Sequence, residues 1–177
     1  MQRPLRVRDV MYAFLFARIK AGDRVLDAGC GDGALALAIT RRIPKATVVG
    51  IEPDRALARH ANQRFRRAGC AGRVRCRRGD AEDARLLFGR RRFECAIVHN
   101  AFHEFWRPVA ALRSIRAALK PGGLLLIAEL APRFGETVDD CPRYSREKLR
   151  EFATRAGFRR CTAALRHPNA ILLRAEA

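Results

Sequence analysis

The chain has 177 residues, of which 49% are hydrophobic, so its composition argues against a disordered chain and is typical of one folded domain, 1–177. No apolar run reaches the roughly 18 residues that a membrane-spanning helix needs, so we expect a cytoplasmic protein with no membrane partner. The net charge of +18 favours anionic partners such as RNA, although 32 of the 36 basic residues are arginine, which fits a coding bias equally well.

Helical and strand-like patterns alternate along the chain. Apolar residues at helical spacing predict a leading amphipathic helix over 7–19, within a segment 1–22 that either covers a ligand as a lid or packs as an ordinary helix. The later patterns predict, in order, a strand over 24–29, a helix over 33–42, a strand over 46–52, a helix over 54–67, a strand over 73–80, a weak helix over 82–88, a strand over 93–100, a helix over 107–119, a turn at 120–123, an apolar strand over 124–130, a loop over 131–144, a helix over 145–157 and two strands around a turn at 167–169. Such alternation predicts an α/β fold, a doubly wound open sheet with helices on both faces and an antiparallel hairpin at its end.

Six cysteines occur without a Cys-x-x-Cys pair, which argues against a zinc ribbon or a thioredoxin-like redox site. We expect them to be small buried side chains and expect no metal site. A disulfide or a soft-metal cluster of three is the alternative, which titration of free thiols would test. The six are Cys30, Cys70, Cys76, Cys95, Cys141 and Cys161.

The stretch "VLDAGCGDGALALAIT", residues 25–40, turns from a buried strand into a helix through three glycines. Without Cβ atoms at Gly29, Gly31 and Gly33, a ligand can approach the backbone amides at a helix N-terminus. The same spacing also matches the dinucleotide fingerprint, so the glycines alone leave a nicotinamide-dependent enzyme open. Asp27 disfavours that alternative, because a carboxylate below the loop would repel a pyrophosphate and suits a cationic ligand.

Two more acids end the next two predicted strands. Glu52 ends the second, where its oxygens could bind both hydroxyls of a ribose, and Asp80 ends the third, where it could accept from an exocyclic amine. Because the carboxyl ends of parallel strands meet at one edge of the sheet, the three acids predict a nucleoside site there. Either Glu52 or Asp80 could instead be a helix N-cap, and Asp32 fits a cap better than a ligand contact.

Six motifs in this order resemble the class I S-adenosylmethionine-dependent methyltransferases, in particular the small type 11 and type 25 methyltransferase domains. They are "DAGCGDG" (27–33), "GIEPD" (50–54), "GDAED" (79–83), "FECAIVHNAFHEF" (93–105), "LKPGGLLLIAE" (119–129) and "YSREKLREFATRAGF" (144–158). The resemblance implies a Rossmann-like seven-stranded sheet in the order 3-2-1-4-5-7-6 with strand 7 antiparallel, and S-adenosylmethionine as the cofactor.

The resemblance also implies roles for individual residues. Asp27 would lie near the methionine amino group, Glu52 would hold the ribose, and Asp80 with the amide of Ala81 would face the adenine. His99 would border the methyl group, where the family more often has a small polar residue, and Glu94 stands where Asp is frequent. The complete set implied to bind the cofactor is Asp27, Ala28, Gly29, Cys30, Gly31, Glu52, Pro53, Asp80, Ala81 and His99.

Methyl transfer from a sulfonium needs a nucleophile held in line, and it needs a base only if the nucleophile keeps its proton until late. Candidates for that base are His103, His99, Glu104 and Tyr144. The alternative for His103 and Glu104 is that they only open the next helix, beside aromatic residues of the core.

The acceptor is the least determined part. A small molecule is favoured over RNA, because the chain has no Asn/Asp-Pro-Pro-Tyr signature and no room for an added RNA-binding domain. An anionic acceptor could be bound by arginines on the reactive side, with the loop 131–144 shaping its pocket; these are Arg77 or Arg78, Arg107, Arg133, Arg143 and Arg146. Methyl transfer to RNA, or a non-catalytic cofactor-binding subunit, are the alternatives. The sequence does not define the acceptor atom or the oligomeric state.

Overall fold

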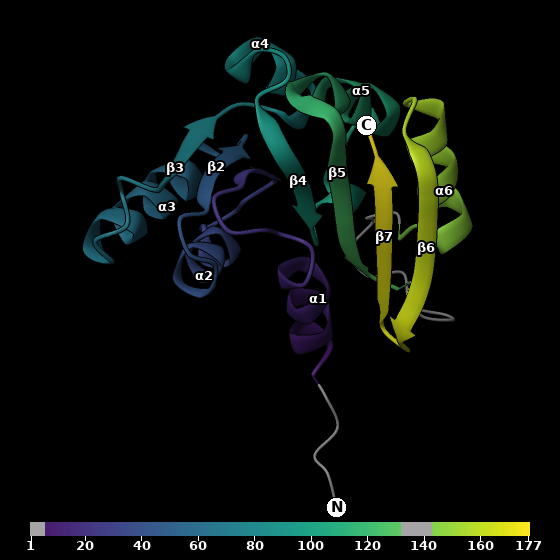
Figure 1. Cartoon of the computed structure of the whole chain (residues 1–177), viewed down its shortest axis with the longest axis horizontal. Helices are drawn as coiled ribbons and strands as arrows, with labels where there is room; N and C mark the ends of the chain where they lie inside the picture. The colour runs from purple at the N-terminus through teal and green to yellow at the C-terminus, as the bar shows by residue number, and fades with distance from the viewer. Residues whose placement is uncertain (1–5, 132–142) are drawn as a thin grey trace, which may run out of the picture.

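The computed structural model describes residues 6–131 and 143–177 and shows an α/β fold with a seven-stranded sheet (Figure 1). The strand order β3-β2-β1-β4-β5-β7-β6 and the antiparallel β7 confirm the predicted fold class. The strands are β1 (Arg24–Ala28), β2 (Thr47–Glu52), β3 (Val74–Arg78), β4 (Phe93–His99), β5 (Leu119–Leu130), β6 (Arg159–His167) and β7 (Ala170–Glu176).

Helices cover both faces of the sheet, and each face has its own hydrophobic core. One core joins α1 (Val7–Phe16), α2 (Ala34–Arg42) and α3 (Arg55–Arg67) to the sheet. The opposite core joins α4 (Ala84–Phe88), α5 (Pro108–Ala118) and α6 (Arg146–Arg155) to the other face. Two short 3-10 turns, η1 (Ala81–Asp83) and η2 (Phe102–Glu104), follow β3 and β4. The central strands are therefore buried on both sides, which explains their continuous apolar runs.

The leading helix is shorter than predicted, because it ends at Phe16 rather than at residue 19. Ile19 is nevertheless only 6% exposed and packs in the same core as Met11 and Leu15 of the helix. Ile19 was included in the predicted helix because it is apolar, but it is buried in the segment that follows the helix. In Figure 1 α1 lies near the ends to which the arrows of β4 and β5 point, and it contacts β5, β6 and β7.

The segment 120–123 is not a separate turn before the strand, as predicted, but an irregular part of β5 itself. Leu119 already pairs with Phe93, and the register then jumps so that Leu124 pairs with Cys95. At Gly123 a Cβ would lie 2.9 Å from the carbonyl oxygen of Lys120, so the chain folds back on itself there. Helix α5 thus passes directly into β5, with the glycines accommodating an insertion in the ladder.

The turn from β1 into α2, which positions the glycine loop, depends on close packing against α3. Gly33 has a φ of +77°, and a Cβ there would lie 2.4 Å from the Phe65 ring. Asp32 accepts from the Ala34 amide at 3.0 Å and pairs with Arg64 at 2.6 Å. The N-cap of α2 is therefore Gly33 and not Asp32, the residue that the sequence predicted, but Asp32 binds the first helical amide from the preceding position and fixes the start of α2 against α3.

Candidate active site

A cavity of about 290 Å³ lies at the carboxyl edge of the sheet, where β1, β2 and β4 end. It contains many of the residues that the sequence singled out, together with residues from the leading helix and from α2. Its lining consists of Tyr12, Asp27, Gly29, Cys30, Gly31, Asp32, Ala34, Leu35, Glu52, Leu57, His99, Asn100, Ala101 and Glu104.

Asp27 is the most unusual group in this cavity. Its side chain is only 1% exposed, and Oδ2 has no hydrogen-bond partner. Burial raises the pKa of the Asp27 carboxyl from 3.8 to about 7, with a smaller contribution from the charge of Glu52. A buried polar atom without a partner is unfavourable unless something else satisfies it, and a cationic ligand in the cavity would do so.

The glycine loop is held onto β2 by its own backbone. The amides of Gly29 and Cys30 both donate to the carbonyl of Ile51, at 2.9 and 3.1 Å. Gly29 has a φ of +77°, and a Cβ on it would lie 2.5 Å from the Ala101 Cβ, so only glycine fits. At Gly31 a Cβ would meet no atom within 4 Å, so the backbone there faces open space. The loop therefore leaves room for a ligand beside its main chain.

Glu52 fastens this loop as well as lining the cavity. It is 7% exposed, and its two oxygens accept from the amides of Gly31 at 2.9 Å and Asp54 at 3.0 Å. The actual N-cap of α3 is Asp54, which accepts from the Leu57 amide at 2.7 Å. Each carboxylate oxygen can accept more than one hydrogen bond, so Glu52 keeps acceptor capacity for hydroxyl groups.

Several predicted cofactor residues do not line this cavity: Ala28, Pro53, Asp80 and Ala81. Asp80 is exposed, and its side chain caps η1 by accepting from the Glu82 amide at 3.1 Å. The capping alternative for Asp80 is therefore what the structure shows. Its assignment to the adenine stays a prediction.

His99 ends β4 and faces the leading helix. Its Nε2 is buried without a hydrogen-bond partner, and its ring lies edge-on to the Tyr12 ring with centroids 5.4 Å apart. Burial lowers the pKa of His99 below its usual 6.5, so the imidazole is neutral at physiological pH, with the charge of Glu129 opposing this shift. Tyr12 was not predicted as a site residue, and its only signal was a polar-tipped aromatic within the apolar run "VMYAFLF" of this helix.

A second buried carboxylate, Glu129 near the end of β5, organises the segment after β4. One oxygen accepts from the amides of Ala101 at 2.8 Å and Phe102 at 2.6 Å, and the other lies 2.9 Å from His103 Nδ1. Glu129 and His103 are 3% and 8% exposed. Glu129 was not among the predicted site residues, although a lone carboxylate in the apolar run "LLLIAEL" is a signal, because a buried charge requires partners.

The His103–Glu129 pair lies beside the cavity rather than in its lining. On the other side of the imidazole, Nε2 is 3.6 Å from Oε1 of Glu104, which does line the cavity. Nη1 of Arg143 lies 3.8 Å from the same Glu129 oxygen, Oε2, and donates to Asn100 Oδ1 at 3.3 Å.

Tyr144, the fourth candidate base, lies within an aromatic cluster, with ring centroids 5.7 Å from Phe102 and 5.2 Å from Phe152. Burial raises the pKa of Tyr144 above 10.0, so its hydroxyl stays protonated at neutral pH. Trp106, by contrast, is 90% exposed and not a core residue.

The arginines expected on the reactive side mostly have other partners. Arg107 pairs with Glu82 at 3.3 Å, and Arg146 with Glu147 at 2.5 Å. Arg77 and Arg78 donate to the backbone carbonyls of Leu87 and Pro53. Arg133 lies outside the described residues, as does most of the loop 131–144. Arg143 alone of the described members of this set reaches a residue of the cavity lining.

The cysteines of the described residues are all free thiols, and no cluster within 6–131 and 143–177 could hold a metal ion. Cys30, Cys76 and Cys95 are buried, as expected, whereas Cys70 and Cys161 are partly exposed. The sulfur atoms of Cys30 and Cys76 lie 3.3 Å apart without a disulfide. Cys141 lies outside the described residues.

These residues fit the cofactor that the resemblance implies. A nucleoside with a cationic amino acid side needs a buried carboxylate without a protein partner, which Asp27 Oδ2 supplies. It also needs an open main-chain path, which Gly29 and Gly31 supply. An open parallel sheet with acids at its carboxyl edge, below a glycine loop that opens a helix, defines a Rossmann-like nucleoside-binding domain.

Comparison with known proteins places this domain in a family. Residues 25–123 match the model of the methyltransferase domain, so the chain belongs to the methyltransferase-domain family of class I, whose cofactor is S-adenosylmethionine. The expected family and cofactor are thus confirmed. No helix of residues 6–131 and 143–177 combines the length and apolar character needed to cross a bilayer.

Individual relatives agree with this assignment. The chain is 32% identical over 114 residues to the ubiquinone/menaquinone biosynthesis C-methyltransferase UbiE of Pseudomonas putida, covering 64% of this chain and 44% of that protein. It is 26% identical over 127 residues to an uncharacterised methyltransferase of Schizosaccharomyces pombe, covering 70% of this chain and 46% of the relative. The chain thus spans less than half the length of these curated relatives. A solved SAM-dependent methyltransferase from Aquifex aeolicus has the same fold, with a TM-score of 0.79 at 19% identity over 96% of this chain and 88% of that one.

Proposed function

We propose that this chain transfers a methyl group from S-adenosylmethionine to a small-molecule acceptor that must lose a proton, and that His103 takes that proton. The observation that carries the methyltransferase part is the buried, unpartnered Oδ2 of Asp27 in the cavity beside the glycine loop. Asp27, Gly29, Gly31 and Glu52 would hold the cofactor.

The cofactor, when bound, supplies a sulfonium methyl group that is already activated for displacement. The protein's own contribution is then to exclude water, to hold the acceptor in line, and to accept a proton where the acceptor is a weak nucleophile. Tyr12 and His99 form one wall of the cavity, with their rings edge-on and the centroids 5.4 Å apart. These two rings help to exclude water from the cavity, and the unpartnered His99 Nε2 is available to a bound ligand.

Glu129 determines the chemical state of His103. Because its carboxylate lies 2.9 Å from Nδ1, that nitrogen is the one that carries the proton, and Nε2 is left with its lone pair. Two amides donate to the other oxygen of Glu129, which stabilises its charge. The negative charge in turn stabilises the imidazolium that forms when Nε2 takes a proton, as in other base–carboxylate pairs.

One comparison supports a small acceptor with an acidic proton. The name of the Pseudomonas putida relative specifies C-methylation in quinone biosynthesis, and methylation at carbon requires removal of a proton from the carbon that accepts the methyl group. Of the described arginines predicted to bind an anionic acceptor, only Arg143 supports that prediction. Its guanidinium donates to Asn100 of the cavity lining, but its charge is partly compensated by Glu129.

The test is methyl transfer measured as formation of S-adenosylhomocysteine with a panel of quinols, phenols, β-dicarbonyl compounds and amines. For the active class, we expect His103→Gln to lower kcat at least about 100-fold, the usual contribution of a general base. Glu129→Gln keeps an oxygen for the two amides and should lower kcat and shift the pH profile. Calorimetry should show cofactor affinity unchanged in both variants. His60→Gln, on the outer surface of α3, is the matched control.

An unchanged rate and pH profile in His103→Gln would remove His103 as the base. Failure of every acceptor class, with tight cofactor binding retained, would refute the proposed acceptor and favour a non-catalytic role.

RNA is the second candidate acceptor, and one observation favours it. Trp106 follows η2, close in sequence to Ala101 and Glu104 of the cavity lining, and its side chain is 90% exposed, as a platform for a stacked base would be. Methylation of an RNA substrate should then fall steeply between 50 and 200 mM salt and should depend on Trp106, whereas a small neutral acceptor would show neither effect.

A further inference from the structure

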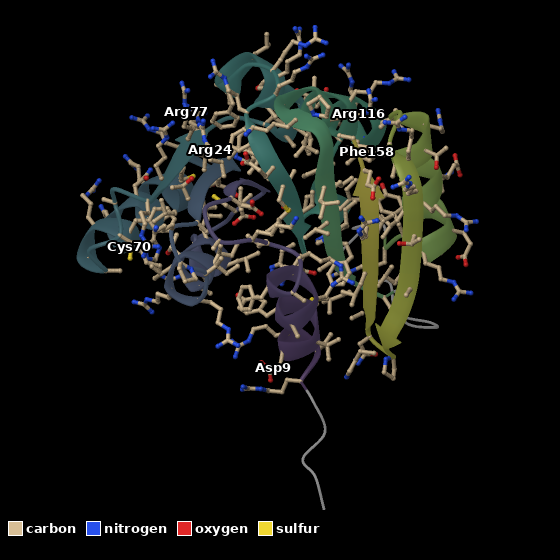
Figure 2. All side chains as sticks on the ribbon, viewed as in Figure 1. Asp9, Arg24, Cys70, Arg77, Arg116 and Phe158 are labelled. Atoms are coloured by element: carbon tan, nitrogen blue, oxygen red, sulfur yellow. The ribbon has the colours of Figure 1, made fainter. Side chains whose placement is uncertain are left out.

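Basic side chains gather at the amino edge of the sheet, opposite the active-site cavity. Figure 2 shows blue-tipped side chains along the upper rim near the labelled Arg116, above the starts of β4 and β5. A cavity of about 260 Å³, which we call the amino-edge pocket, lies in this region. It is lined by Arg90, Arg91, Arg116, Ala117, Leu119, Lys120, Pro121, Arg159 and Ala177.

Among the described residues, an acidic side chain pairs with only one of the cations that line this pocket. Lys120 is hydrogen-bonded to Glu94, so its charge is largely compensated. Arg90, Arg91, Arg116 and Arg159 form no ion pair with any acidic side chain in the part of the chain that the structure describes. Four guanidinium groups around one small cavity repel one another, and an anion bound between them would relieve that repulsion.

The main chain at Arg91 is fixed against the carboxyl end of α5. Arg91 has a φ of +54°, a left-handed backbone conformation that residues other than glycine rarely adopt. Its amide and that of Arg92 donate to the carbonyls of Ala117 and Ala118, at 3.1 and 2.7 Å. The carboxyl end of α5 is thus already capped by main-chain amides, so capping does not require the guanidinium groups of Arg90 and Arg91.

The guanidinium of Arg116 lies beside the main chain of a neighbouring glycine. Gly157, with a φ of +91°, has no Cβ, and one placed there would lie 3.4 Å from Cζ and from Nη1 of Arg116. The guanidinium therefore lies beside the backbone between α6 and β6. Arg116 is exposed, so its guanidinium is accessible to a ligand in the amino-edge pocket.

We propose that the amino-edge pocket binds a di- or triphosphate group. Guanidinium groups form paired hydrogen bonds to phosphate oxygens, and several converging guanidiniums match the several charges of an oligophosphate. The size of the cavity suits a compact ligand of this kind rather than a folded polymer. The pocket lies at the edge of the sheet opposite Asp27 and Glu52, so it is a separate site and its ligand is not the methyl acceptor.

The test is calorimetric titration of the protein with inorganic triphosphate at 0.15 M salt, repeated on two double variants. Arg90→Gln/Arg116→Gln removes two cations of the pocket. Arg55→Gln/Arg59→Gln removes two exposed arginines of α3, so both variants change the net charge equally. We expect saturable binding that weakens at least about tenfold in the pocket variant, because each charged hydrogen bond contributes substantially, and less than about twofold in the control.

Three results would overturn the proposal: no saturable binding, equal weakening in both variants, or binding of a 20-nucleotide single-stranded RNA through Arg90 and Arg116 that triphosphate does not compete away. The last would instead identify a nucleic-acid surface. Affinity for S-adenosylhomocysteine, measured in the same samples, should be equal in all three proteins. A loss of that affinity would concern the proposed function and not this pocket.

Discussion

Replacing Asp27 by asparagine should stabilise the protein and at the same time abolish its cofactor binding. The folded carboxyl titrates near pH 7 and the unfolded one near 3.8, so between these values the folded state binds more protons. Stability therefore falls as the pH rises through that window. The difference corresponds to roughly 4 kcal/mol of unfavourable free energy at pH 8 and roughly 2 kcal/mol at pH 5.

The Asp27→Asn variant removes this titration but still buries an amide with few partners. We expect that amide to cost about as much as the protonated Asp27 carboxyl, about 2 kcal/mol in each case, so these two costs cancel. The variant should then gain about 4 kcal/mol over the wild type at pH 8 and about 2 kcal/mol at pH 5. Urea unfolding followed by circular dichroism at both pH values measures this difference. Asp9→Asn, which changes a partly exposed carboxylate on α1, is the control and should show no such pH dependence.

Cofactor affinity should change in the opposite direction to stability. Asp27 must be ionised to pair with an ammonium group, so wild-type affinity for S-adenosylmethionine should fall about tenfold per pH unit below pH 7. In Asp27→Asn the affinity should be at least about 100-fold weaker at pH 8 and nearly independent of pH. A variant less stable than the wild type at pH 8, or one that binds the cofactor normally, would refute the reasoning that the cavity holds a carboxylate for a cation.

Two further substitutions test the packing around the site. Gly33→Ala should lower the free energy of unfolding in urea by about 3 kcal/mol, because a Cβ 2.4 Å from the Phe65 ring adds overpacking to the strain of a positive φ. Gly69→Ala, the control, has a φ of +66° and no atom within 4 Å of the added Cβ, so it should lower that free energy by only about 1 kcal/mol. Tyr12→Ala should weaken cofactor affinity about tenfold by calorimetry, because it opens the cavity wall beside His99. Tyr12→Phe, which keeps the ring, should bind the cofactor normally. Equal affinities in Tyr12→Ala and Tyr12→Phe would show that α1 does not cover the cofactor.

Much of the fold could be predicted from the sequence, because local signals and burial agree along most of the chain. Gly157 ends α6 with a φ of +91°, and Ser145 begins it by accepting from the Lys148 amide at 3.2 Å. The segment 120–123 was misjudged for a physical reason. Proline and glycine usually mark a turn, but here they form an insertion in β5 whose ladder partners lie far away in the sequence, where local pattern does not reach.

The site was only partly predictable for a related reason. Asp27 and Glu52 could be found because strand ends meet at one edge of a parallel sheet. Glu129 was missed because its partners, two amides and His103, come from a segment about 26 residues earlier, and nothing local to β5 indicates them. Tyr12 was missed because the docking of α1 depends on tertiary packing against β5 and β7.

The chain polarity of the α/β fold explains why this protein separates its charges. Helices run opposite to the parallel strands, so their amino ends gather beside the carboxyl ends of the strands, where acids are favoured, and their carboxyl ends gather at the amino edge, where cations are favoured. Helix ends account for Arg41, Arg42, Arg66 and Arg67 in this way.

The same polarity does not account for Asp27. Glu52 and Glu129 both accept from backbone amides, whereas Oδ2 of Asp27 accepts from none. Its burial costs roughly 4 kcal/mol at pH 8, a large part of the stability of an average domain, and no described contact offsets it. A group that lowers stability and has no structural partner is expected where a ligand supplies the missing contact. The unfavourable burial of Asp27 is therefore the strongest physical argument that this cavity binds a cation.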